Sequence, residues 1–186
     1  MYVDEYFDAL PDCIRSGTSL KSLLDTVQRT DGFTLSQVCA FTGLEGSTVQ
    51  NWVKRGFVAH PENKKYRERQ IARILIISAL RDALGIDGIV SLMSYVNGDV
   101  EDEADDIVSE AKLLGYFTAA LSSVGNDEIS IAVRKVTSDF GKDTEAGTRL
   151  CNALAVMVTA AQAAVLKKRA ERQLEQIKIS GNNKNI

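Results

Sequence analysis

The stretch that decides the fold is residues 34–56, TLSQVCAFTGLEGSTVQNWVKRG, which contains two helix starts of the same design. Thr34 and Gln37 fit a capping box, in which a hydroxyl accepts the N–H of the third residue and the glutamine side chain returns to the cap. Ser47 and Gln50 repeat this spacing. The stretch therefore predicts two consecutive short helices.

Glycines set the expected ends of both helices, because glycine readily adopts the left-handed conformation that follows a helix. Two short helices joined by about four residues that include a glycine form a helix-turn-helix. The first helix is predicted over residues 35–42 with Gly43 as its stop, and the second from Ser47 or Thr48 to Arg55 with Gly56 as its stop.

The second helix has two distinct faces. A helix turns by 100° per residue, so burying the apolar residues of this segment points its polar residues to solvent. Trp52 is expected in the core, because tryptophan at an inward position usually packs there. The inward residues are Val49, Trp52 and Val53, and the outward ones are Ser47, Gln50, Asn51 and Lys54, with Arg55 at the edge.

These outward residue types suit a DNA duplex. Asparagine and glutamine pair with adenine in the major groove, and lysine suits guanine or a backbone phosphate. Ser47 stands where backbone N–H groups and the helix dipole can meet a phosphate. The alternative is a three-helix scaffold that binds a protein, and we favour DNA because basic residues gather on this face.

The following segments continue the module. Residues 57–66 contain proline and asparagine between short apolar and Lys/Tyr segments, so we expect a small hairpin or loop. A helix with one apolar face is expected over residues 67–84, and another, capped by Asp87, over residues 88–97. The apolar face of the first comprises Ile71, Ile74, Leu75 and Ser78.

In this order the motifs resemble a MerR-type winged helix-turn-helix. The resemblance is carried by residues 36–44 (SQVCAFTGL), by Trp52, by Gly56-Phe57, by Tyr66-Arg67 and by residues 84–89 (LGIDGI). Within that superfamily, residues 51–56 (NWVKRG) followed by residues 65–72 (KYRERQIA) are similar to an uncharacterised bacterial family, domain of unknown function 1836, over roughly residues 34–97.

The resemblance implies a second helix in the major groove, a wing against the DNA backbone and dimerisation through a long C-terminal helix. Gln50 matches the family's usual arginine, Trp52 its aromatic residue, and Tyr66-Arg67 the Tyr-Arg pair of the wing. The wing is shorter than usual, Arg69 replaces a second tyrosine, and the cysteine pair of metal sensors is missing. The candidate DNA-binding residues are Ser47, Thr48, Gln50, Asn51, Lys54, Arg55, Lys64, Lys65, Tyr66 and Arg67.

Composition agrees with a helical protein whose charge is unevenly distributed. The 186 residues are 45% hydrophobic and 25% charged, with 2 prolines and 13 glycines, which favours an all-α chain. The net charge is −3, yet residues 34–81 hold 8 Lys/Arg against 3 Asp/Glu, a net +5. Residues 82–133 hold 1 Lys/Arg against 11 Asp/Glu, a net charge of −10. An electrostatic partner therefore meets a basic module within an acidic protein.

The remaining composition favours a reduced, intracellular setting. Cys13, Cys39, Cys151 and the single His60 are too far apart in sequence for a disulfide framework or a zinc site. The acidic N-terminus lacks the pattern of a signal peptide, so we expect a cytoplasmic protein. The uncharged segment over residues 150–166 carries polar residues and is interpreted as a core helix or dimer seam, not a membrane span.

Beyond residue 97 the sequence predicts further helices. The run from Asp99 to Glu110 has seven acidic residues and no basic residue. We expect it to begin a helix that reaches Leu121, because acidic residues are favourable at a helix N-terminus. Its acidic side chains are interpreted as a solvated helix face. Residues 129–140 keep helical spacing, and residues 145–177 read as one long helix. The bases at residues 167–172 are interpreted as a solvated helix end, with DNA contact as the alternative.

The sequence therefore predicts a helical lead-in over residues 1–33, a winged helix-turn-helix over 34–97, a helical dimerisation or regulatory region over 98–179 and a disordered tail over 180–186. The expected function is a dimeric, DNA-binding transcriptional regulator. No catalytic motif, cofactor site or metal site is found, so we expect no enzyme. The rival is a protein-interaction adaptor or anti-repressor that docks through the acidic run at residues 99–110, and a second rival is an enzyme in the C-terminal region.

Overall fold

The computed structural model describes residues 17–124, 128–141 and 144–182. These residues are mostly helical, as the all-α prediction requires, with one small sheet. Predictions for residues 1–16 and 183–186 lie outside the described residues. The elements are α3 (Gly17–Arg29), β1 (Phe33–Thr34), α4 (Leu35–Thr42), α5 (Gly46–Lys54), β2 (Lys65–Tyr66), α6 (Glu68–Leu80), α7 (Ile86–Asn97), α8 (Glu110–Ser123), α9 (Ile129–Val136) and α10 (Glu145–Asn182).

Helix α6 is the central element, and the prediction of a single apolar face for it is wrong. Every residue from Gln70 to Ile77 is buried, because α3, α7, α8 and α10 cover α6 from different sides. The helix also ends at Leu80, four residues earlier than expected. Its side chains join those of α5 and α8 in one hydrophobic core, so residues 34–97 share that core with the region that follows them.

Helix α4 forms as its local sequence dictates. The Thr34 N–H donates to Gln37 Oε1 at 2.9 Å, and the Thr34 hydroxyl accepts from the Gln37 N–H at 3.4 Å, which completes the predicted capping box. Gly43 ends the helix with φ +69°, and its N–H bonds the Cys39 carbonyl at 2.9 Å. The predicted bounds and both end signals of this helix are confirmed.

The second predicted capping box does not form. Helix α5 begins at Gly46, because the Glu45 carbonyl accepts the first helical N–H groups, from Thr48 at 3.0 Å and Val49 at 3.3 Å. Glu45 occupies the cap position and makes no side-chain hydrogen bond there. The Ser47 hydroxyl is therefore released from the capping role that the sequence assigned to it.

The small sheet differs from the predicted hairpin. Strand β2 pairs antiparallel with β1, so Tyr66 lies opposite Phe33, and within residues 57–66 only Glu62 and Lys65 form a bridge. Residues 57–59 belong to no strand, and their side chains are buried in the core. The sheet thereby connects the chain before α4 to the chain after α5.

The acidic run also differs from its prediction. Residues 99–109 form a loop, and the helix opens only at Glu110, where the Ser109 hydroxyl accepts the Lys112 N–H at 3.3 Å. Asp87 does not cap α7, because Gly85 holds that position. Residues 129–136 are helical as expected, although Phe140 lies beyond the end of that helix.

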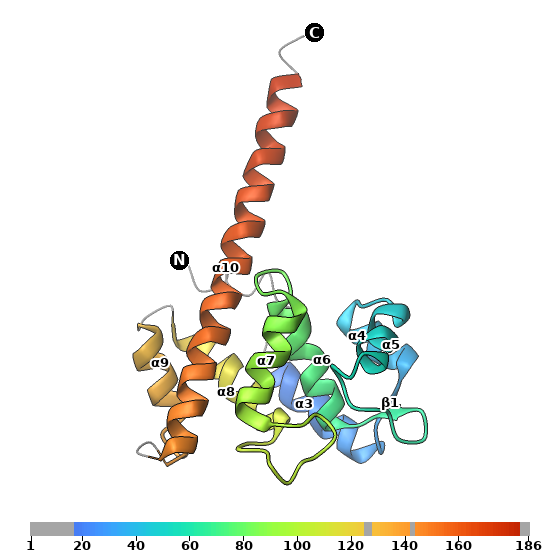
Figure 1. Cartoon of the computed structure of the whole chain (residues 1–186). Coiled ribbons are helices and arrows are strands. Elements are labelled where there is room, and N and C mark those ends of the chain that lie inside the picture. Colours follow the sequence, from blue (N-terminus) through green and yellow to red (C-terminus); the bar gives the residue numbers. More distant parts are fainter. Residues whose placement is uncertain (1–16, 125–127, 142–143, 183–186) are drawn as a thin grey trace.

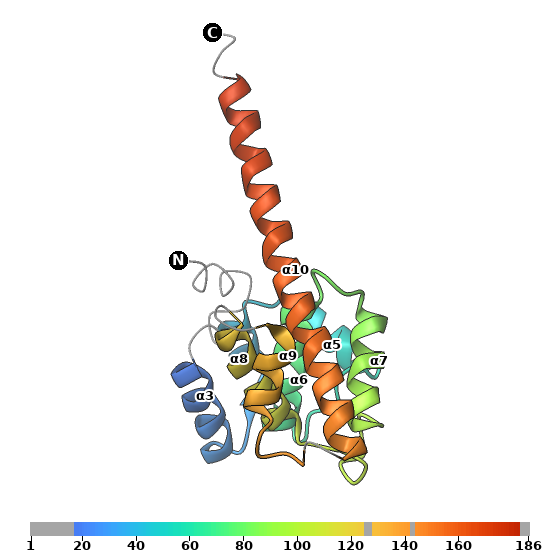
Figure 2. The same ribbon diagram turned by 90° about the vertical axis from the view of Figure 1, so that its left-hand side faces the viewer.

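Helix α10 is the longest element, with 38 residues, and continues through Asn182, beyond the predicted start of the tail. Its first half packs against α6, α7, α8 and α9, while its second half extends away from the rest of the molecule (Figures 1 and 2). By length and composition it is the one described helix that could cross a membrane, but half of its apolar window is buried inside the protein.

Candidate nucleic-acid interface

The two faces of α5 lie as the sequence predicts. Val49, Trp52 and Val53 are buried, and Val49 has no exposed surface. Thr48 is half-buried, whereas the side chains expected to face outward are all exposed. These exposed side chains are Ser47, Gln50, Asn51, Lys54 and Arg55. Within the described part of the chain, the side chains of the first four have no hydrogen-bond or ion-pair partner, so they are available to a ligand.

The end of α5 is held firmly against its neighbours. The Arg55 guanidinium lies 4.4 Å from the Phe57 ring centre and 4.0 Å from Asp87 Oδ1 at the start of α7. The Arg81 guanidinium lies 6.0 Å from the centre of the Trp52 ring. Cation–π contacts and core burial together fix the outward face of α5 relative to α6 and α7.

The candidates that follow α5 are not equally placed. Lys64 is exposed at the tip of a tight turn, where Asn63 and Lys64 both have positive φ, 49° and 63°. The half-buried Lys65 donates to the Thr30 carbonyl at 3.0 Å. Arg67 pairs at 3.1 Å with Asp31 Oδ1 and at 3.0 Å with Glu62 Oε2. Lys64 is therefore the base of this segment that is best presented to a partner.

The Tyr66 side chain lies in the core and not at the surface. It is 4% exposed, and burial is the main cause that raises the pKa of its hydroxyl. A buried ring cannot stack on or bond to a duplex at the surface, so we leave Tyr66 out of the candidate interface. Its position follows from the pairing of β2 with β1, which turns this side chain inward.

A buried ion pair, which no motif in the sequence indicated, connects the segment after α5 to α8. Arg73 of α6, 3% exposed, donates to the Phe57 carbonyl at 2.7 Å and pairs with the fully buried carboxylate of Glu110. Burial raises the pKa of Glu110 against the opposing pull of Arg73, and one oxygen, Glu110 Oε2, has no partner. The only sequence signal was an arginine within an apolar helix.

The acidic loop folds back onto the basic module instead of forming a solvated helix face. Arg69, on α6, lies 3.2 Å from Glu103 Oε1 and donates to the Asp102 carbonyl at 3.2 Å. Glu101 Oε1 accepts from the His60 backbone N–H at 3.2 Å and lies 3.1 Å from its Nδ1. Burial raises the pKa of Asp106, which lies 4.0 Å from Arg69. Part of the module's positive charge is thus neutralised internally.

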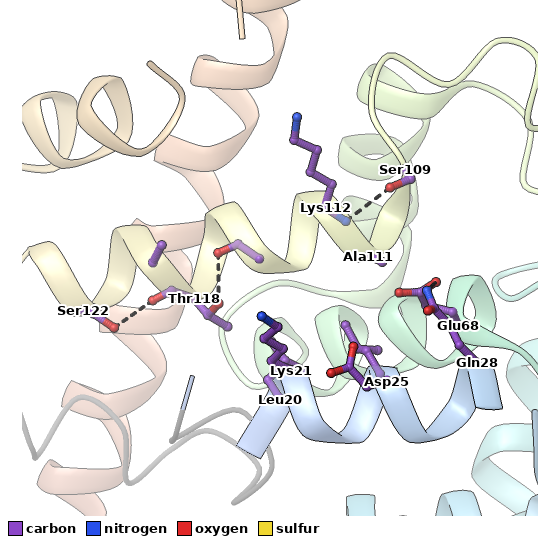
Figure 3. Close-up of a pocket in the computed structure, with 13 residues that line it drawn as sticks. Leu20, Lys21, Asp25, Gln28, Glu68, Ser109, Ala111, Lys112, Thr118 and Ser122 are labelled. Atoms are coloured by element: carbon purple, nitrogen blue, oxygen red, sulfur yellow. Dashed lines mark hydrogen bonds between the residues drawn. The ribbon is translucent and has the colours of Figure 1, made fainter. Parts of the chain in front are cut away.

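A groove of about 650 Å³ runs between α3 and α8. Small residues of α8, among them Gly115 and Ala119, form one wall, and Lys21 extends toward them from α3 while the Lys112 ammonium points away (Figure 3). Gln28 donates to Glu68 at 2.7 Å across the groove. Among the described lining residues no buried side-chain polar atom lacks a hydrogen-bond partner.

The protruding helix α10 carries an apolar stripe. Val156, Leu166, Leu174 and Ile177 are 45%, 56%, 53% and 69% exposed. At 100° per residue they share one face with Thr159, Ala163 and Ala170, opposite the face that is buried by Leu150 and Leu154. We call this set, at residues 156, 159, 163, 166, 170, 174 and 177, the α10 stripe.

No metal site is evident in the described part of the chain: its residues contain no group of three His, Cys, Asp or Glu side chains that could hold an ion. Cys39 and Cys151 are both free thiols.

The fold and this surface define a helical protein organised around α6, with a polar helix presented to solvent. The chain belongs to the family described as domain of unknown function (DUF1836), whose model matches residues 20–116, more than half of the chain. That range runs from α3 into α8 and so includes the Arg73–Glu110 pair. The family assignment made from the sequence is confirmed.

A relative with sequence similarity is known in Bacillus subtilis (strain 168). The uncharacterized protein YkrK is 32% identical over 79 residues, which cover 40% of this chain and 34% of the relative. The match therefore spans about a third of the relative's length. No solved structure matches this chain significantly.

Proposed function

We propose that the protein is a sequence-specific DNA-binding transcriptional regulator with a MerR-like winged helix-turn-helix. In this proposal α4 and α5 are the helix pair, α5 is the reading helix, and the turn around Lys64 is the wing. The observation that carries the proposal is the outward face of α5, whose polar side chains are exposed and unengaged while its other face is buried. Amide and ammonium groups on a fixed helix suit base edges in the major groove.

The arrangement of charge supports the same function. Lys54 and Arg55 are exposed at the end of α5, and Lys64 is exposed at the following turn. The acids of the loop at residues 99–109 contact Arg69 and His60, not these bases. A duplex can therefore approach α5 and Lys64 although the protein as a whole is acidic.

We further propose that the regulator is a homodimer through α10. Val156, Ala163, Ala170 and Ile177 recur every seven residues within the α10 stripe, the spacing of a coiled-coil seam. From Val156 to Ile177 this seam is about 32 Å long at 1.5 Å per residue. A second copy of the same helix would bury this apolar face, and two copies would present two reading helices to one duplex.

The test of DNA binding is the selection of bound duplexes by the purified full chain, followed by affinity measurements over a range of salt. Asn51→Ala should relax the preference at one base pair, a cost of about 1–3 kcal/mol, because a bidentate amide contact is lost. Ser36→Ala, an exposed change on α4, should leave the preference intact. An Asn51 variant that keeps the full preference would contradict base reading by α5.

The wing assignment has a matched pair of neighbouring lysines. Lys64→Gln should flatten the plot of log affinity against log salt by about 0.9, the value for one phosphate contact. Lys65→Gln should change that slope less, because the Lys65 ammonium is already bonded to Thr30. Equal slopes for wild type and Lys64→Gln would exclude this wing contact.

The rival adaptor function makes the opposite forecast. It predicts no retardation of any duplex at low salt, together with a protein partner that is lost when Asp102 and Asp105, both exposed in the acidic loop, are neutralised. That combined result would replace the DNA-binding proposal.

A further inference from the structure

The groove between α3 and α8 has an uncovered wall of small residues. Ala111, Gly115 and Ala119 are spaced four positions apart on α8, so they share one face of that helix. A Cβ built at Gly115 would meet no heavy atom of the described residues within 4 Å, and Ala119 is exposed. The opposite face of α8 is buried through Leu113 and Phe117. Another chain segment can therefore approach this wall closely, because no large side chain stands in its way.

The groove has a defined length and direction. Helices α3 and α8 run in opposite directions along it: Ser122 lies toward the end where α3 begins, and Ser109 lies toward Gln28 near the end of α3 (Figure 3). From Ser109 to Ser122 the wall of α8 is about 20 Å long at 1.5 Å per residue. A helical segment of eight residues, about 12 Å long, fits within this length.

The chain immediately before α3 has the sequence pattern of such a segment. Sixteen residues precede Gly17, and they lie outside the described residues. Their apolar residues recur at intervals of four, three and four positions, the spacing of one helical face. These are Val3, Phe7, Leu10 and Ile14, and the acidic residues Asp4, Glu5, Asp8 and Asp12 fall outside that face. Proline interrupts a helix, so Pro11 predicts a helix over residues 3–10 and a linker over residues 11–16.

We propose that residues 3–10 fold back into the groove of the same chain and place Val3, Phe7 and Leu10 against the small-residue wall of α8. The linker joins α3 at Gly17, three positions before Leu20, which lines the groove. Because the segment is tethered at the mouth of the groove, its effective concentration there is high, and weak apolar contacts suffice to hold it. The inference does not depend on DNA binding.

Charge favours the same occupant. Residues 1–16 hold four acidic residues and one basic residue, a net charge of −3. The Lys21 side chain extends toward α8 at the end of the groove where the linker joins α3 (Figure 3). Within the described part of the chain this ammonium has no ion-pair or hydrogen-bond partner. An acidic segment that enters the groove therefore meets an unpaired positive charge.

The experiment measures how fast chymotrypsin cleaves after Phe7 in four folded, full-length proteins, with the fragments identified by mass. They are wild type, Gly115→Glu, Val3→Asp/Leu10→Asp, and the control Gly88→Glu. Gly115→Glu places a charged side chain in the groove, while glutamate favours a helix more than glycine does. Gly88 is a matched control, because it is a helical glycine of α7 whose added Cβ also meets no described atom within 4 Å. Thermal unfolding confirms that each variant is folded.

We expect Gly115→Glu and Val3→Asp/Leu10→Asp each to be cleaved at least about tenfold faster than wild type, because native proteolysis follows the population of the undocked segment. Gly88→Glu should match wild type. Equal rates in all four proteins would overturn the inference. A mixture at micromolar concentration of Gly115→Glu, which has an intact segment, with Val3→Asp/Leu10→Asp, which has an open groove, should give no added protection. Protection of the Gly115→Glu chain in that mixture would assign the groove to the segment of a second copy and overturn docking within one chain.

Discussion

Replacing Arg73 with methionine tests whether the buried ion pair joins α5 to α8. Methionine keeps the helix propensity and most of the volume but removes the charge, so Glu110 is left buried without its counter-ion. Breaking a buried pair from one side costs about 3–5 kcal/mol. For a domain of this size that corresponds to a fall in melting temperature of about 6–20 °C.

The pH dependence of this loss has a defined sign. Burial already raises the pKa of Glu110 above its ordinary value of 4.5, and removing Arg73 raises it further. A carboxyl whose pKa is higher in the folded state than in the unfolded state stabilises the fold at low pH, and that stability is lost as the pH rises through the folded pKa. The deficit of Arg73→Met should therefore be largest at pH 7 and shrink as the pH falls toward 4.5.

Urea unfolding of four proteins measures the effect: wild type, Arg73→Met, Glu110→Met and the double variant. The double variant should regain most of the lost stability or exceed wild type by about 1–4 kcal/mol, because apolar side chains of similar size replace the pair. A loss below about 1 kcal/mol for Arg73→Met, or strict additivity in the double variant, would refute the reasoning.

Three further predictions concern the local structure and the assembly. Thr34→Ala should lower the free energy of unfolding by about 1 kcal/mol, whereas Ser47→Ala should lower it by less than about 0.5 kcal/mol, because only the Thr34 side chain caps a helix. Chemical denaturation measures both losses, and equal losses for the two variants would contradict this prediction. Gly32→Ala should lower the melting temperature more than Gly56→Ala, since both have positive φ but only at Gly32 would a Cβ lie 2.9 Å from the Tyr66 carbonyl oxygen. Leu174→Asp, on the α10 stripe, should shift the mass measured by light scattering from dimer to monomer, and a wild type that is already monomeric would remove the dimer proposal.

The helices with complete local signals could be predicted from the sequence. Helix α4 has a cap formed by Thr34 with Gln37 and a stop at Gly43, whose N–H bonds the Cys39 carbonyl. Helix α5 has an apolar face formed by residues 49, 52 and 53. Each of these features involves residues at most four positions apart. Periodicity likewise indicated α10 over residues 145–177, and the structure extends it to Asn182. These features depend on backbone hydrogen bonds between residues that are close in sequence, and the residue types at those positions determine whether the bonds form.

The acidic run shows where local reasoning failed. Acids near a helix start are favourable, so residues 99–109 looked helical. In the folded protein Arg69 and His60, about 30 to 40 positions earlier in the sequence, attract the same acids and hold them as a loop. Which interaction wins depends on how close these bases lie to the acids in space, and the sequence does not contain that distance.

The sequence by itself determined the helical class, the family, and the polar outward face of α5. Only the tertiary structure decided that Tyr66 is buried, that Lys64 is better presented than Lys65, and that Arg73 links Phe57 to Glu110. The physical reason is the range of the interactions. Caps and amphipathic faces involve residues up to four positions apart, whereas Tyr66 pairs with Phe33 and Arg73 with Glu110 across 33 and 37 positions, and the packing of α6 brings those partners together.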